Sequence, residues 1–224
     1  MSISIAHDAP AKVELSLKTW QIFLLILLAN LLVSWVYNEF ILTREVYHNL
    51  LSEQLEANRI DEYFDITRKL SIWGYLLQPL LFWLQIAFFA LLIQTPLMLL
   101  FIEIPFRQVF RIVLVASLAV SALSVIQLLK LSFYAPSEIT EAVLNVVPFS
   151  LTNFIDPADY PKTAFFVLNK FSLFELAWCV LLYRGLAATE KLKKDTAMFL
   201  VTGLWIALLL FQWAIVAYFA GVNG

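Results

Sequence analysis

The 224-residue chain is dominated by apolar side chains, because 62% of its residues are hydrophobic and only 14% are charged. Soluble domains carry about 25% charged residues, so this composition excludes an ordinary soluble enzyme or regulatory domain. The formal net charge of −2 provides no basic surface for nucleic acid, and we expect no nucleic-acid partner.

Five apolar stretches occupy most of the chain, and each is about as long as the 20 residues that a helix needs to cross a bilayer. They lie at about 20–42, 73–101, 109–133, 164–187 and 198–220. None alternates as the strands of a membrane barrel do. The pattern predicts an all-α, polytopic membrane protein: one membrane domain over 1–224, built as a five-transmembrane-helix bundle.

The connection between the first two spans, on what we expect to be the outer side, carries two amphipathic patterns. Residues 45–58 and 61–70 place apolar side chains near one helical face, with acidic side chains over much of the rest. We expect short amphipathic extramembrane helices there, which cap the bundle or lie at the lipid headgroups. A further short helix is expected over 137–147, followed by an irregular segment, 148–163, that folds back onto the bundle.

Basic residues in the loops orient the bundle, because cytoplasmic loops carry more lysine and arginine. The connection between the last two spans is short and strongly basic, with Arg184, Lys191, Lys193 and Lys194. The connection 43–71 is long and acidic, although the total count is only eight basic residues, Lys12 among them, against seven. We expect a cytoplasmic N-terminus, a C-terminus outside and, in a bacterium, location in the inner (plasma) membrane.

Polar side chains within the spans are the main candidates for function, because they are costly in lipid and usually face the bundle interior. The candidate intramembrane polar network consists of Asn30, Gln85, Ser121, Gln127, Glu175 and Gln212. Glu175 is the only acid near a span centre, so we expect it to be protonated, hydrogen-bonded or paired. Gln85 and Asn30 are its best predicted partners, whereas Lys170, more than one turn outward, is expected to extend toward the interface. The network either fixes helix register, lines a proton or solute path, or contacts a partner.

A tight joint, 102–108, connects the second and third spans and predicts that these helices are antiparallel neighbours. Arg107 and Arg111 lie one turn apart just after it. They are either ordinary interfacial anchors or contacts for an anionic headgroup or an acidic partner.

Catalytic motifs are absent from the sequence. The two histidines, His7 and His48, form no zinc-protease motif, and the chain has neither a glycine-rich phosphate loop nor a Gly-x-Ser-x-Gly elbow. Cys179 is the only cysteine and gives no metal framework. We therefore expect no catalytic residue, no cofactor and no metal site.

Four features together resemble a known membrane-protein family over about 73–220. They are the joint before Phe106-Arg107-Gln108-Val109-Phe110, the stretch 169–185, the basic joint Lys191-Leu192-Lys193-Lys194 and the last span with Trp205. The chain resembles the Yip family, multi-span proteins known in eukaryotes as Rab-interacting factors of the early secretory pathway, with bacterial relatives. The resemblance implies five spans and a cytoplasmic N-terminus. The long cytoplasmic N-terminal region of the eukaryotic members is missing, so we expect a bacterial-type relative rather than a Rab partner.

The expected function is that of a non-enzymatic membrane subunit. It would act as a scaffold, assembly or trafficking factor through helix–helix contacts with other membrane proteins or further copies of itself, and membrane lipids are the other expected partners. The alternative is a small transporter or channel subunit that uses a midplane polar layer centred on Glu175.

Overall fold

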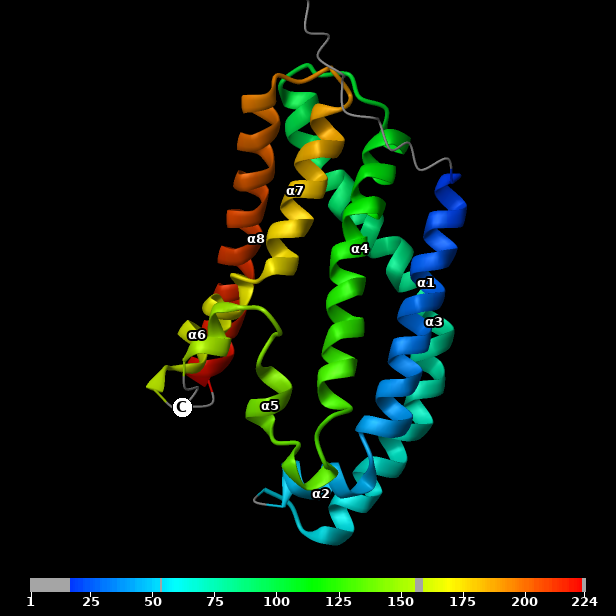
Figure 1. Cartoon of the computed structure of the whole chain (residues 1–224), viewed down its shortest axis with the longest axis vertical. Coiled ribbons are helices and arrows are strands. Elements are labelled where there is room, and N and C mark those ends of the chain that lie inside the picture. The colour runs from blue at the N-terminus through cyan, green and yellow to red at the C-terminus, as the bar shows by residue number, and fades with distance from the viewer. Residues whose placement is uncertain (1–16, 53, 156–158, 223–224) are drawn as a thin grey trace, which may run out of the picture.

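The computed structural model describes residues 17–52, 54–155 and 159–222, so that Lys12 and His7 lie outside the described residues. Within these ranges the elements are helices, and the β-structure is limited to one isolated bridge. The predicted all-α class is confirmed (Figure 1).

Four helices are long and apolar enough to cross a membrane, which indicates a multi-pass membrane protein. They are α1 (Thr19–Val36, continued by a π-helical turn, Tyr37–Ile41), α3 (Ala57–Leu99), α4 (Phe106–Leu131) and α8 (Lys194–Val222). Each corresponds to a predicted apolar stretch. Helix α3 begins at Ala57, well before the expected start near residue 73, and continues through Pro79 and Pro96.

Helix α4 and the shorter α7 (Leu173–Ala187) form the centre of the bundle, with α8 on one side and α1 on the other (Figure 1). Their facing side chains include Leu114, Leu182 and Leu186, all of which are fully buried. At Gly185 the two helices approach so closely that an added Cβ would lie 2.5 Å from Cγ2 of Ile112. These aliphatic side chains belong to the main hydrophobic core, and their removal from water stabilises it.

The fourth apolar stretch is not the single continuous helix that the sequence predicted. It forms α6 (Lys162–Lys170) and α7, separated by Phe171 and Ser172. Ser172 caps α7, because its Oγ accepts a hydrogen bond from the Glu175 amide at 3.2 Å. Ser172 and Glu175 follow the Ser-x-x-Glu spacing that is typical of a helix start, and the long apolar run obscured this signal. The expectation of one helix over 164–187 was wrong.

The break between α6 and α7 is covered by the segment that folds back after α5. Leu151 N donates to Phe171 O at 3.2 Å, and Leu173 N donates to Phe149 O at 3.0 Å. The bridge pairs Ser150 with Ser172. These bonds satisfy backbone polar groups that the interruption of the helix would otherwise leave unpaired.

The expected helix over 137–147 is divided into a 3₁₀ turn (Pro136–Glu138) and the short α5 (Glu141–Asn145). A second 3₁₀ turn (Leu151–Phe154) follows in the segment that covers the break. The expected return of this segment onto the bundle is therefore seen in its described part.

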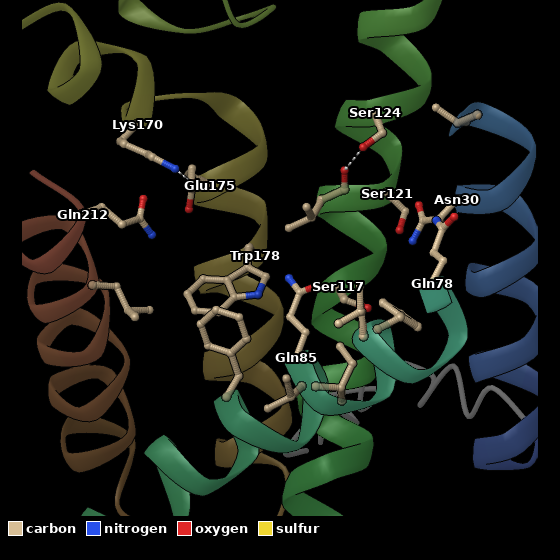
Figure 2. Close-up of a pocket in the computed structure, with 18 of the residues that line it drawn as sticks. Asn30, Gln78, Gln85, Ser117, Ser121, Ser124, Lys170, Glu175, Trp178 and Gln212 are labelled. Atoms are coloured by element: carbon tan, nitrogen blue, oxygen red, sulfur yellow. Dashed lines mark hydrogen bonds and ion pairs between the residues drawn. The ribbon is translucent and has the colours of Figure 1, made fainter. Parts of the chain in front are cut away.

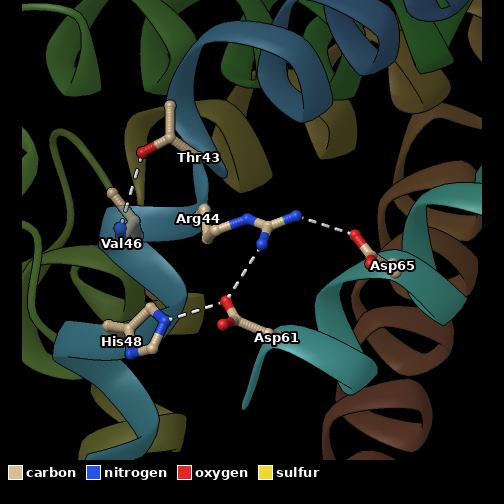
Figure 3. A network of polar contacts seen from close by, with 6 residues as sticks. All are labelled: Thr43, Arg44, Val46, His48, Asp61 and Asp65. Atoms are coloured by element: carbon tan, nitrogen blue, oxygen red, sulfur yellow. Dashed lines mark hydrogen bonds and ion pairs between the residues drawn. The ribbon is translucent and has the colours of Figure 1, made fainter. Parts of the chain in front are cut away.

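At the opposite end from the α3–α4 joint, α2 (Arg44–Leu51) lies on the first turns of α3 (Figure 3). Arg44 pairs with Asp61 at 3.3 Å and with Asp65 at 2.9 Å, and His48 Nε2 lies 3.0 Å from Asp61 Oδ1. Such exposed pairs contribute about 0–1 kcal/mol each, so the buried Val46 is the stronger anchor. The predicted helix over 61–70 is not separate, because it is the beginning of α3.

Candidate functional site

A polar cavity of about 480 Å³ lies between the helices (Figure 2). Its walls come from α1, α3, α4, α7 and α8, together with the last residue of α6. Five residues of the predicted polar network line it: Asn30, Gln85, Ser121, Glu175 and Gln212. Side chains that are far apart in the sequence are therefore brought to one space, whose size suits a small-molecule ligand.

Gln127, the sixth network residue, lies elsewhere. Its Nε2 donates to Leu144 O at 3.1 Å, while Lys130 Nζ donates to Val143 O at 3.1 Å and to Val146 O at 3.0 Å. These two side chains satisfy carbonyls at the end of α5, which a five-residue helix would otherwise leave open. Gln127 is thus a local anchor for the covering segment rather than a cavity residue.

Further polar residues of the cavity wall lie on the same helical faces as the predicted ones. Ser34 is one turn from Asn30, Gln78 is two turns from Gln85, and Ser117 and Ser124 flank Ser121. The spacing of these residues was a usable signal in the sequence. Trp178 and Trp205, which also line the cavity, have no polar periodicity that could have identified them.

Glu175 pairs with Lys170 rather than with its predicted partners, Gln85 and Asn30. Lys170 Nζ lies 3.7 Å from Glu175 Oε1, whereas no hydrogen bond among the described residues joins Glu175 to Gln85 or Asn30. A continuous helix would keep a lysine five residues earlier on a different face. The break after Lys170 removes that constraint and turns the side chain back toward Glu175 (Figure 2).

A second cavity, of about 760 Å³, is also lined by this ion pair. Its wall includes α5, Tyr160, α6 and Val216 of α8, and it shares only Lys170 and Glu175 with the first cavity. The ion pair therefore lines both cavities, at the point where the helix is broken.

The described wall of the first cavity carries one positive and one negative side chain. Among the described residues that line it, Lys170 and Glu175 are the charged ones, and the remaining polar groups are amides and hydroxyls, apart from the two indoles. Such a wall can hydrogen-bond and can balance one positive and one negative charge. No group of three metal-binding side chains occurs in the part of the chain that the structure describes.

Arg107 and Arg111 lie at the start of α4 and are exposed, away from either cavity. Arg111 Nη2 donates to Leu17 O at 3.2 Å, so this side chain also holds the chain just before α1. At the same end of the bundle, Gln94 connects α3 to the joint before α4, because its Nε2 donates to Ile104 O at 3.0 Å.

No protein-family model, curated protein or solved structure matches the chain. The cavity and its two charged residues are therefore the features that indicate function.

Proposed function

We propose that this protein is a small transporter or channel subunit that admits a polar solute into the cavity between its helices. The observation that carries the proposal is the convergence of amide, hydroxyl and charged side chains from six helices on one cavity. Polar groups within a membrane are costly, and their usual place is a solute or ion path or a contact between helices.

A purely structural network is the weaker explanation. Hydrogen bonds between helices are what make such residues stabilising. Among the described residues, no hydrogen bond joins any two of the five network residues on the cavity wall. Their polar groups instead face a space large enough for water or solute, which can satisfy them.

The proposed topology has five crossings, with α6 and α7 together making the fourth. Helix α7 alone is about 22 Å long, which is shorter than a hydrocarbon core of about 30 Å, and α6 lies at its start. We place the N-terminus in the cytoplasm and the C-terminus outside, in the plasma (inner) membrane of a bacterium. The basic connection between α7 and α8 supports this orientation.

Thiol labelling tests whether the cavity contains water. In a Cys179→Ala background, Ser124→Cys places a thiol on the cavity wall, and Val125→Cys places one on the next residue of α4, outside the wall. A charged, membrane-impermeant thiol reagent should label Ser124→Cys at least about tenfold faster, because a charge in hydrocarbon costs about 2.5–3.5 kcal/mol. Equal, slow labelling of both thiols would refute a solute path.

A scaffold or assembly role is the second candidate, and it would be non-enzymatic as well. Three phenylalanines are more exposed than most apolar residues of the chain: Phe101 (93%), Phe133 (87%) and Phe154 (86%). Such side chains suit contact with lipid or with another membrane protein. Purification in mild detergent, with identification of stably bound proteins or a second copy, tests this role. A chain that purifies alone and moves a solute in liposomes would exclude it.

Membership of the Yip family and lipid contact by Arg107 and Arg111 stay predictions.

A further inference from the structure

We propose that the polar cavity binds a small zwitterion at the Lys170–Glu175 pair, with the ligand's anionic group on Lys170 and its ammonium group on Glu175. The ligand chemistry is an amine and an anionic oxygen group a few bonds apart. Two kinds of molecule have both groups: a free neutral amino acid and the headgroup of phosphatidylethanolamine. The proposal deepens the proposed function and rests on it.

Charge balance within the cavity selects a zwitterion. Each charged group on the described wall has one counterpart there, the other member of the pair. A simple cation bound at Glu175 would take the carboxylate from Lys170 and place two positive charges together, and a simple anion at Lys170 would do the reverse. Leaving a desolvated charge unpaired is strongly unfavourable. A zwitterion replaces one ion pair by two and leaves no charge unmatched.

The geometry of the Lys170–Glu175 pair would allow a ligand to replace the direct contact between the two side chains. At 3.7 Å, Nζ and Oε1 are close enough for an ion pair but beyond hydrogen-bond distance. Each side chain keeps 29% of its surface exposed. Both groups also line both cavities, so a ligand could reach them from either side.

The backbone that carries the two charges is held in place before any ligand arrives. Phe171 O and Leu173 N are both hydrogen-bonded to the covering segment, and Ser172 caps α7. Lys170 and Glu175 therefore extend from the two edges of a fixed break. Preorganisation of this kind lowers the entropic cost of binding. Gln212 lies beside the pair in Figure 2 and offers further donors and an acceptor.

Binding to purified, delipidated protein tests the proposal in two arms. The first measures saturable binding of a radiolabelled mixture of neutral L-amino acids. The second uses native mass spectrometry to compare retention of phosphatidylethanolamine with that of phosphatidylglycerol, which lacks the amine. Saturable amino-acid binding supports a free solute as the source, selective retention of phosphatidylethanolamine supports the lipid, and the absence of both overturns the proposal.

Substitutions at the pair should weaken whichever binding is found. Glu175→Gln keeps the side-chain shape and Lys170→Gln keeps a polar side chain, and each should weaken binding about 30-fold or more, because one charge of the ligand loses its partner. Lys193→Gln, in the α7–α8 connection, removes a lysine outside both cavities and should leave binding unchanged. The double exchange Lys170→Glu/Glu175→Lys should recover part of it, because a zwitterion can bind in the reverse orientation. Unchanged affinity in both glutamine variants would overturn the proposal.

A second measurement keeps the pair intact and so does not depend on the folding of those variants. The bound zwitterion should slow thiol labelling of Ser124→Cys, whereas propionate and propylammonium, which carry one of the two charges each, should not. Equal protection by a single-charge probe would overturn the zwitterion proposal. If the thiol is labelled but no zwitterion binds, the water-filled cavity stands and only this inference fails.

Discussion

Asn169 connects the end of α6 to the segment that covers the helix break. Its Oδ1 accepts from Val147 N at 3.2 Å and from Thr152 Oγ1 at 2.6 Å, and its Nδ2 donates to Asn145 O at 2.9 Å. Thr152 is only 1% exposed. A single amide therefore satisfies groups from three positions of the covering segment, immediately before Lys170.

Asn169→Ala should lower the free energy of unfolding by about 2 kcal/mol, because it removes several bonds at once and deprives a buried hydroxyl of one of its partners. Chemical unfolding in detergent measures this change. Asn49→Ala is the matched control, since Asn49 makes one exposed bond, 2.9 Å from its Nδ2 to Pro136 O, and should cost well under 1 kcal/mol. Equal effects of the two substitutions would show that Asn169 does not hold the break.

Packing of α7 on α4 depends on the absence of a side chain at Gly185. A Cβ there would lie 2.5 Å from Ile112 Cγ2 and 3.3 Å from Ile112 Cβ, so the isoleucine would have to move. Overpacking of this kind costs about 1–3 kcal/mol, against a gain in helix propensity of up to about 1 kcal/mol. Gly185→Ala should therefore lower the free energy of unfolding by about 1–2 kcal/mol, measured by unfolding in detergent.

Two variants check the cause of that loss. Gly203→Ala, on α8, meets no atom within 4 Å and should be neutral or stabilising. In an Ile112→Ala background, Gly185→Ala should destabilise much less, because the 2.5 Å contact with Cγ2 is gone and only the 3.3 Å contact with Cβ remains. A loss of the same size in this background would contradict the packing explanation.

Sequence reasoning located the four long helices because apolar length alone determines them. It could also group most of the cavity residues, since Asn30 and Ser34, or Gln78 and Gln85, recur at helical spacing. It did not predict the break after Lys170, because no glycine or proline marks it and the Ser172 cap lies within an apolar run. The Lys170–Glu175 pair follows from that break and was therefore missed. Which segment covers the break depends on long-range contacts such as Asn169 to Thr152, which leave no local pattern.

The path of the whole chain places its described ends at opposite ends of the bundle (Figure 1). Reporter fusions test the corresponding topology in the membrane. A fusion at Lys193 should report a cytoplasmic location, and a fusion after Gly224 should report an external one, because α8 crosses between them. Reports of the same side from both positions would refute the proposed crossing by α8, and inverted reports would reverse the proposed orientation.

Helix α3 is continuous from the ion pairs with α2 to the joint with α4, and its 43 residues span about 65 Å. That is roughly twice the hydrocarbon thickness of a bilayer, so a large part of this helix must stand outside the lipid or tilt within it. Asp61 and Asp65 pair with Arg44 of α2 near one end of α3, and Gln78 and Gln85 line the cavity further along the same helix. One continuous helix, which contains Pro79, therefore joins the α2 contact to the cavity wall with no loop between them.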